Sequence, residues 1–595
     1  MSDSSLSRFV QTHKVALAVT AIVGAGSVAG LLYYMNQQSA GLDDSSKSKK
    51  KNKNKKKKKS EKKSATVTAN WPSSNIPINE STGLPNVTED LVKGMTKEER
   101  NKWALALKET GNQYYKAEDF KPAIECYSLA LLCKTDPVFY ANRAACYAAQ
   151  GEHEKCIDDC TEALKLNPGY SKCLLRRAHA YESIEKYEEA IYDLTALTIY
   201  GGLNDQSPET FLERNLKKLA NKINEERFST LPKELPSSSS ISSFFGAFAK
   251  ENIDLDESKY PDQSCSQFLV KGLNEMAKDT YDNYVNADVL FHQAVTSYEK
   301  DSSNTDVKHA ALAYEYKGTF DFLKGESESA VSNFNKALSL APRCRTHVLL
   351  GLVNADKGDF ASADEEIGKA IKMNPEDPDI YYHYGQLFYL MGDLDKAKDN
   401  FEKSKLYNPE NVFGHIQLAC IAYRKGESAT CDELFREAKR KFPTSPEVPN
   451  YYGEILFDRQ DYTAAAKQFD TAARLQEVLP TFNIGALPLI NKSAIFQVNK
   501  DIAGCEQLLK TACELDPKSE VARINLGQIY LQAQKVKDAI ELFEEACRLS
   551  RSNDDRVQAI SLMEASKIQL KIKEDPILSA KVEEILRRAG IERNA

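Results

Sequence analysis

The stretch LKETGNQYYKAEDFKPAIECYSLAL, from Leu107 to Leu131, has the spacing of a helix, a short turn and a second helix. Gly111 falls in the expected first helix, and Tyr127 and Ala130 fall in the expected second helix. The same order of small and aromatic residues returns along the chain about every 33 to 34 residues. A hairpin that recurs at a fixed period predicts a stacked array, in which each hairpin covers the apolar face of the next.

The period and its marks are those of the tetratricopeptide repeat (TPR), a hairpin of two helices with small and aromatic residues at fixed positions. Small residues let the paired helices approach, and aromatic residues fill the gap between neighbouring hairpins. The sequence therefore predicts an all-α superhelical solenoid in two parts with a concave groove. Its repeats begin at Ala104, Pro137 and Ser171 in a first series, and near Phe268 and at Ala311, Cys344, Pro378, Val412, Pro446, Ala486 and Glu520 in a second.

The N-terminal region differs in composition from the rest of the chain. Residues 1–63 hold 14 Lys or Arg against 4 Asp or Glu, whereas the remainder is acidic overall. Residues 15–35 carry no charge, and at about 1.5 Å per residue they would reach roughly 31 Å, enough to span a bilayer. We expect an uncleaved anchor there, with cleavage near residues 25–29 as the alternative. The twelve lysines of residues 47–63 favour a cytosolic location for the remainder of the chain.

These features divide the chain into six segments. We expect a short N-terminal segment, a transmembrane helix, a lysine-rich disordered tether, a three-repeat domain, a helix with a linker, and an eight-repeat domain that ends in two capping helices. Their boundaries are 1–14, 15–35, 36–95, 96–200, 201–267 and 268–595, with the capping helices near 555–572 and 576–588.

The linker contains the sequence SSFFGAF, which places Phe244, Phe245 and Phe248 at helical spacing. Three exposed aromatic rings would form an unfavourable apolar patch in water. We therefore expect this stretch to dock between the two parts of the solenoid, as a hinge or plug rather than a binding site.

The first helix of each repeat is expected to line the concave face through positions 2, 5, 6 and 9. In the three-repeat domain these positions supply Lys108 and Asn112, then Asn142, then Lys172 and Arg176. Two amides with cations can hold the paired carboxylates at the C-terminus of an acidic peptide through charge-assisted hydrogen bonds. Taken singly, each of these residues also fits a solvated lysine or a capping asparagine, so the prediction depends on their convergence.

The second series has no basic cluster of this kind. Its concave positions are mixed, which suggests a wider, partly apolar and partly acidic groove for extended or helical polypeptide segments. Some of these residues could instead pack between helices. The candidates are Tyr382, Gln386, Ile416, Cys420, Asn450, Glu454, Ile524 and Gln528.

The pattern KxxxN, N, KxxxR in the three-repeat domain resembles the two-carboxylate clamp of chaperone-binding TPR domains. The resemblance implies that the ligand is the EEVD-type C-terminal tail of the ninety- and seventy-kilodalton heat-shock chaperones. A membrane-anchored or cytosolic co-chaperone without a role in import is the alternative that shares this clamp.

The whole chain resembles the TPR-containing import receptors of the seventy-kilodalton class in the TOM translocase of the mitochondrial outer membrane. This resemblance implies a single-pass N-terminal anchor with the bulk of the chain in the cytosol. It also implies binding of chaperone-delivered precursors, especially carrier proteins with internal signals, and their transfer to the general import pore alongside other TOM subunits. It rests on ALALKETGNQYY, DPVFYANRAACY, YSKCLLRRA, SSFFG and FREAKRKFPTSPEVPNYYGEI.

Several classes of function are disfavoured by what the repeats leave over. No phosphate-binding loop, metal-ligand cluster or nucleophile triad remains, so we expect neither an enzyme nor a cofactor or metal. Cys156 and Cys160 are expected to be buried packing residues rather than metal ligands. The acidic body argues against nucleic acid. Gly26 and Gly30 form a GxxxG pair, which leaves a homodimer open.

Overall fold

The computed structural model describes residues 71–72, 76–79, 83–201, 207–302, 306–479 and 484–588. Within these ranges the chain is helical, with no β-sheet beyond one isolated bridge between Ile78 and Pro85. The predicted all-α solenoid of helical hairpins is confirmed. None of the helices described is both long and apolar enough to cross a membrane, and the anchor predicted at residues 15–35 lies outside the described ranges.

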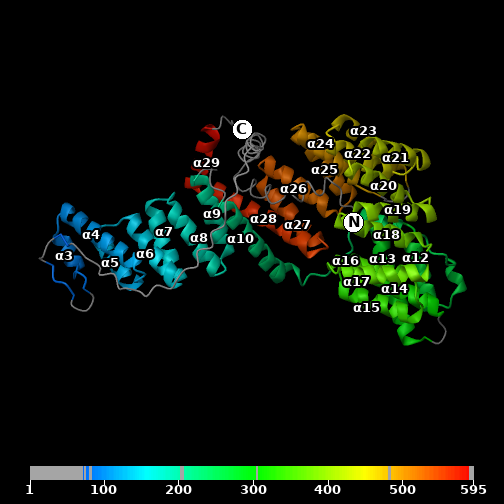
Figure 1. Ribbon diagram of the computed structural model, residues 1–595, viewed down its shortest axis with the longest axis horizontal. Coiled ribbons are helices and arrows are strands. Elements are labelled where there is room, and N and C mark those ends of the chain that lie inside the picture. Colours follow the sequence, from blue (N-terminus) through cyan, green and yellow to red (C-terminus); the bar gives the residue numbers. More distant parts are fainter. Residues whose placement is uncertain are drawn as a thin grey trace. The chain divides into compact units, whose positions relative to one another are not determined.

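The chain forms two compact units. We call the first the three-hairpin unit; it comprises the described residues from 71 to 223 together with 534–540 and 561–588. Its hairpins pair α4 with α5, α6 with α7 and α8 with α9, and α10 packs on α9 (Figure 1). Its helices are α3 (Glu89–Gly94), α4 (Lys97–Lys116), α5 (Phe120–Cys133), α6 (Pro137–Gln150), α7 (His153–Leu166), α8 (Ser171–Ser183), α9 (Tyr187–Gly201), α10 (Ser207–Ile223), the end of α28 (Asn553–Glu574) and α29 (Pro576–Arg588).

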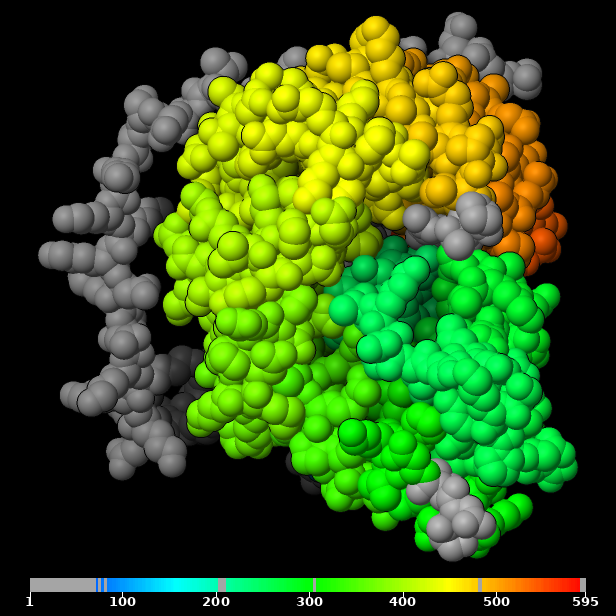
Figure 2. Space-filling view, turned by 90° about the vertical axis from the view of Figure 1, so that its right-hand side faces the viewer, coloured from blue at the N-terminus to red at the C-terminus, as the bar shows by residue number. Residues whose placement is uncertain are grey.

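The eight-hairpin unit comprises the described residues within 224–533 and 541–560. Its green, yellow and orange helices curve around a hollow face in Figure 2. A π-helical turn (Asn224–Phe228) and α11 (Ser238–Gly246) precede its hairpins. The hairpin helices are α12 (Cys265–Met276), α13 (Tyr281–Lys300), α14 (Val307–Leu323), α15 (Ser327–Leu340), α16 (Cys344–Asp356), α17 (Phe360–Met373), α18 (Pro378–Met391), α19 (Leu394–Tyr407), α20 (Val412–Arg424), α21 (Ser428–Lys441), α22 (Glu447–Asp458), α23 (Tyr462–Val478), α24 (Leu487–Val498), α25 (Ile502–Leu515), α26 (Glu520–Gln532) and α27 (Val536–Leu549), whose first residues, up to 540, fall in the three-hairpin unit.

One contact explains the close approach of the two helices in most hairpins. A glycine at position 8 of the first helix faces an aromatic ring at position 24 of the second. A Cβ added at Gly385 would lie 2.8 Å from Cε1 of Phe401, and one at Gly111 would lie 2.8 Å from Cε1 of Tyr127. Contacts shorter than 3.0 Å cannot form without displacement, so glycine at this position sets the spacing of the hairpin.

The start of the three-hairpin unit differs from the prediction. Residues 76–79 and 83–95 were expected within the disordered tether, but in the structure they pack on the first hairpin. Val87 and Val92 are buried in one apolar cluster with Trp103 of α4. The prediction is wrong here because the polar composition of this stretch hides a few apolar residues that cover the open edge of the first repeat.

The C-terminal helices also differ from their expected role. They were predicted to close the eight-repeat domain, but from residue 561 onward they belong to the three-hairpin unit. Ile568 and Leu578 are buried in the cluster that contains Leu194 of α9. Tyr192 Oη donates a hydrogen bond of 2.7 Å to Asp575 Oδ2. These helices therefore cover an apolar face of the third hairpin.

The SSFFGAF stretch lies inside the eight-hairpin unit rather than between the two parts of the solenoid. Ile241 of α11 is fully buried, and Phe245 packs on Tyr316 and Phe320 of α14 with ring centroids 6.0 and 5.9 Å apart. The expected burial of the aromatic residues is present, but the expected partner surface was wrong. The first helices of successive hairpins in one unit offer enough apolar surface to bury them.

Candidate functional site: the concave face of the three-hairpin unit

The candidate clamp residues come from the first helices of three successive hairpins. Lys108 and Asn112 lie one turn apart on α4, Asn142 lies on α6, and Lys172 and Arg176 lie one turn apart on α8. Helix α6 contacts both α4 and α8, so the three helices are neighbours in one layer. Thr96 caps the N-terminus of α4 in a reciprocal pair with Glu99, which fixes the start of the helix that carries two of the five residues.

The structure joins Asn112 and Asn142 directly. Asn142 Nδ2 donates to Asn112 Oδ1 at 3.2 Å, and Tyr127 Oη donates to the same oxygen at 2.8 Å. Burial raises the pKa of Tyr127, so its hydroxyl stays protonated and acts as a donor. Because Asn112 Oδ1 accepts both bonds, its Nδ2 group keeps its donor hydrogens for a ligand.

Arg176 lies beside this pair of amides. Its Nη1 donates to the carbonyl oxygen of Ala141 at 2.7 Å, and Ala141 directly precedes Asn142 on α6. One hydrogen bond to a main-chain carbonyl orients the guanidinium and leaves other N–H donors unused. The structure therefore brings Asn112, Asn142 and Arg176 together on the same inner layer.

The neighbouring arginine has a different environment. Arg177 donates to both carboxylate oxygens of Asp193 at 2.7 and 2.6 Å and to Thr161 Oγ1 at 2.9 Å. Arg143 repeats this arrangement one hairpin earlier with Asp159 and Ser128. Each ion pair joins the two helices of one hairpin, and the bond to the hydroxyl joins that hairpin to the preceding one, so each guanidinium stabilises the stacking. Arg177 and Arg143 are structural residues, whereas Arg176 has no acidic partner in the described part of the chain.

The two lysines of the candidate clamp lack acidic partners as well. Lys108 is half-buried and Lys172 is exposed. Within the ranges that the structure describes, neither forms an ion pair, although Lys165 pairs with Glu162 and Lys155 with Glu152 in the same unit. Three cations without counter-charges beside two oriented amides give this face a positive potential and open donors.

Some groove candidates of the eight-hairpin unit are buried between helices, and others are half-buried or hydrogen-bonded to a neighbour. Ile416 is fully buried with Phe435 and Val448 in the packing of α20 to α22, so its prediction as a groove contact is wrong. The reason is steric, since α22 approaches closely enough to cover it. Ile524 is buried too, Gln386 donates to Tyr382 Oη at 2.9 Å, and Cys420 and Gln528 are half-buried.

Asn450 and Glu454 belong to a buried polar cluster. Asn450 Nδ2 and Asn491 Nδ2 donate to Glu454 Oε1 at 3.1 and 2.8 Å. Burial raises the pKa of Glu454 to about 7. Both amides donate to the same carboxylate oxygen, Oε1. The sequence predicted the position of these residues, but it gave no sign that Asn491 joins them.

The cysteines pack in the interior. Cys156 and Cys160 are fully buried in the core of the three-hairpin unit, in line with the expected packing role. The described residues hold no disulfide and no group of three potential metal ligands.

Comparison with known proteins places this geometry in a family. The tetratricopeptide repeat family models match residues 137–170, 345–377, 367–399 and 506–554. The mitochondrial import receptor subunit TOM70 of Saccharomyces cerevisiae is 38% identical over 546 residues, which cover 86% of this chain and 88% of the relative. The chain belongs to the TOM70 family. It is therefore a mitochondrial import receptor with a TPR fold, as the resemblance in the sequence implied.

Two further comparisons describe parts of this TOM70-family chain. The crystal structure of the yeast Tom70 is 39% identical and covers 82% of this chain and all of that chain, with a TM-score of 0.55. The Hsp70/Hsp90 co-chaperone CNS1 of Saccharomyces cerevisiae is 38% identical over 117 residues, 19% of this chain and 30% of that protein. The relative that matches over most of both chains, TOM70, is named as an import receptor and not as an enzyme.

The sequence alone missed the residues that orient the site. Tyr127 fixes the amide of Asn112, and the carbonyl of Ala141 fixes Arg176. A signal for the first was present, because position 24 holds Tyr in the first repeat where Phe334, Phe401 and Phe543 occupy it later. Unlike those phenylalanines, Tyr127 carries a hydroxyl, and it reaches Asn112 at position 9.

Proposed function

We propose that the three-hairpin unit of this import receptor docks the acidic C-terminal tails of the ninety- and seventy-kilodalton heat-shock chaperones. Asn112 and Asn142 would donate to the terminal α-carboxylate, and Arg176 with the two lysines would bind the acidic side chains. The observation that carries the proposal is the set of donors on one inner layer without acidic partners in the described residues. The co-chaperone CNS1, named for both chaperones, matches over part of the chain.

The eight-hairpin unit would then receive the precursor that the chaperone releases. Its inner helices offer apolar surface and buried polar groups rather than a cluster of free cations. Such a surface suits segments of many sequences, as carrier precursors with internal signals require. Residues 15–35 would hold the receptor in the mitochondrial outer membrane, next to the other TOM subunits that receive the precursor.

Calorimetry of the full-length chain in detergent, with an acidic tail peptide ending in EEVD, tests the docking step. Arg176→Ala is expected to weaken the binding at least tenfold, because a charge-assisted contact is lost. Lys165→Ala is the matched control, since Lys165 is an exposed cation on α7 that already pairs with Glu162. Equal affinity of Arg176→Ala and the unmodified chain would contradict the assignment.

Capture of a radiolabelled carrier precursor by the same chain separates the import receptor from a co-chaperone. An import receptor binds both the tail peptide and the precursor. Binding of the peptide alone would favour a membrane-anchored co-chaperone, the role suggested by the match to CNS1.

A further inference from the structure

The inner face of the eight-hairpin unit is occupied in this structure by the chain itself. The occupant, which we call the inner segment, comprises residues 235–251 and includes α11. Within the inner segment, the ring centroid of Phe248 lies 4.2 Å from that of His383 on α18. The ring centroid of Phe244 lies 6.1 Å from that of Phe322 on α14. Ala247 is buried beside Tyr382, one of the candidate groove residues. The inner segment thus spans the first helices of at least three hairpins.

The residues that contact the inner segment lie at the repeat positions expected to bind ligands. Tyr316, which stacks on Phe245, is position 6 of the repeat that begins at Ala311, and Glu315 and Thr319, which line a cavity with Phe244 and Phe245, are its positions 5 and 9. Arg345 and Asp379 are position 2 of the next two repeats. The inner segment is therefore held as a bound peptide would be held, on the concave side of the first helices.

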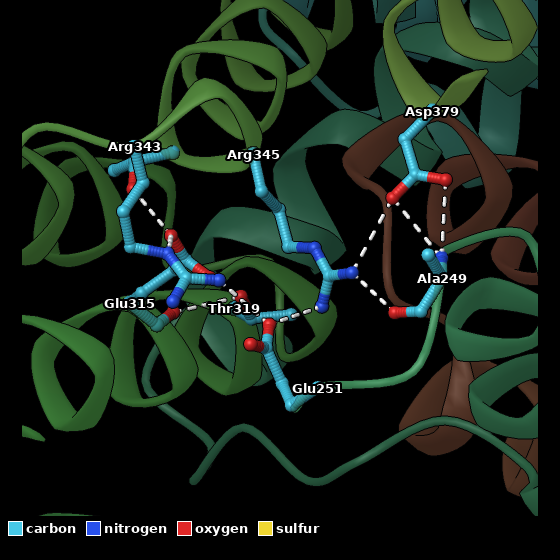
Figure 3. A network of polar contacts seen from close by, with 8 residues as sticks. Ala249, Glu251, Glu315, Thr319, Arg343, Arg345 and Asp379 are labelled. Carbon is cyan, nitrogen blue, oxygen red and sulfur yellow. Dashed lines mark hydrogen bonds and ion pairs between the residues drawn. The ribbon is translucent and has the colours of Figure 1, made fainter. Parts of the chain in front are cut away.

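Main-chain groups of the inner segment are bound specifically (Figure 3). The N–H of Ala249 donates to both carboxylate oxygens of Asp379 at 3.0 Å, and Arg345 Nη2 donates to the carbonyl oxygen of Ala249. Asp379 and Arg345 also pair with each other at 3.3 Å. Contacts to the main chain do not depend on side-chain identity, so this pair could hold any polypeptide in the same register.

Side chains of the inner segment supply the rest of the recognition. Glu251 Oε1 accepts from Arg343 Nη2 at 2.7 Å and from Arg345 Nη1 at 2.6 Å. The guanidinium of Arg345 also lies over the ring of Phe248, 5.0 Å from its centroid. The site therefore combines an aromatic pocket, a main-chain clamp and a carboxylate site within one short stretch.

The fit between the inner segment and this wall is incomplete. Glu315 Oε1 and His383 Nε2 are buried and have no hydrogen-bond partner in the described residues. Glu315 is 1% exposed and His383 is 6% exposed. Glu315 also lines a cavity together with Phe244, Phe245 and Thr319. Buried polar atoms are almost always paired, so the wall has recognition capacity that the inner segment does not use.

The inner segment also lacks the means to hold its own structure. Helix α11 has nine residues, five of which are serine. Helices this short are marginal in water, and serine favours helix ends and turns over helix interiors. Its helical order therefore depends on contact with the wall, and it would be lost if another polypeptide took that place.

We propose that this wall is a binding site for a segment of another polypeptide that carries aromatic side chains spaced like Phe244, Phe245 and Phe248, followed by an acidic residue. The inner segment occupies the site as an internal ligand and competes with that partner. This inference rests on the proposed function, in which the eight-hairpin unit captures precursors. It adds the chemical class of the segment that is bound and the contact that must open first.

Fluorescence anisotropy with a labelled peptide, SSSSISSFFGAFAKEN (residues 237–252), tests the site on the full-length chain in detergent. In the double variant Phe245→Ala with Phe248→Ala the inner segment is weakened, and the peptide is expected to bind at least tenfold more tightly than to the unmodified chain. Adding Arg345→Ala to that variant should abolish the gain. A peptide with all three phenylalanines replaced by serine is the matched control and should not bind.

Capture of a carrier precursor by the same variants distinguishes the two levels of the proposal. Equal peptide affinity for the unmodified and double-variant chains, with precursor capture intact, would overturn the internal-ligand inference and leave the proposed function standing. Absence of precursor capture by every variant would overturn the proposed function itself.

Hydrogen exchange on the unmodified chain decides the question without any substitution. Precursor binding is expected to raise amide exchange at residues 241–249, because the displaced inner segment loses its helix. Unchanged exchange in that range with the precursor bound would overturn the inference, even if the double variant fails to fold.

Discussion

The two units build their inner layers from the same repeat and differ in what meets the side chains there. In the three-hairpin unit Arg176 has one bond to a main-chain carbonyl and no acidic partner in the described residues. In the eight-hairpin unit Arg345 pairs with Glu251 and Asp379, and its guanidinium lies over the ring of Phe248. The repeat fixes where a side chain lies, but the ligand class depends on whether its charge is already neutralised.

The largest effect expected from this comparison concerns Arg177, the structural neighbour of Arg176. Arg177→Ala would leave the carboxylate of Asp193, which is 1% exposed, buried without a partner. Removing one member of a buried ion pair costs about 3–5 kcal/mol. We expect urea unfolding followed by circular dichroism to show that loss for Arg177→Ala and only a small change for Arg176→Ala.

A compensated variant controls for the loss of side-chain volume. Arg177→Met combined with Asp193→Leu replaces the ion pair by apolar groups and should recover most of the stability. If Arg176→Ala proved as destabilising as Arg177→Ala, the distinction between a structural and a ligand-binding arginine would be lost.

The next prediction concerns how the stability of the eight-hairpin unit depends on pH. Burial raises the pKa of Glu454 to about 7, above its ordinary value of 4.5. The folded state therefore holds a proton that the unfolded chain releases, and this contribution to stability is full below pH 4.5 and is lost as the pH rises through 7. Between pH 5 and 8 we expect the free energy of unfolding to fall by about 2–3 kcal/mol from this residue.

Glu454→Gln keeps the shape and the accepting oxygen and removes the titration. Urea midpoints of the eight-hairpin unit measured from pH 5 to 8 should therefore depend less on pH in this variant. An equal slope in both chains would show that Glu454 titrates normally.

A smaller effect tests the spacing that both units share. Gly385→Ala puts a methyl group 2.8 Å from the ring of Phe401, and such overpacking costs about 1–3 kcal/mol. Gly368→Ala, on the second helix of the preceding hairpin, meets no atom within 4 Å. Alanine there should stabilise the helix by roughly 0.5–1 kcal/mol. Thermal unfolding of the two variants should move in opposite directions, and a shared direction would argue against the steric account.

The sequence predicted the repeats well because their marks are local. Gly111 and Tyr127 lie within one hairpin, and their spacing alone identifies the contact between them. The five clamp candidates were predicted for the same reason, since each position within a repeat has a fixed direction in the superhelix.

Contacts between distant segments were beyond such reasoning. Nothing near Asp575 in the sequence indicates that it bonds to Tyr192, and nothing near Ala249 indicates Asp379 as its partner. These contacts depend on which apolar face lacks a neighbour in the assembled array. Ile416 was misassigned because a repeat position gives the direction of a side chain but not how closely the next helix covers it.

The most direct test of the central claim is calorimetry of the full-length chain with two tail peptides that differ only at the C-terminus. One peptide ends in a free carboxylate and the other in an amide, so the amidated peptide lacks the terminal charge assigned to Asn112 and Asn142. We predict at least tenfold weaker binding of the amide, about 1.4 kcal/mol. Equal affinity for the two peptides would contradict the assignment of this face as a carboxylate clamp.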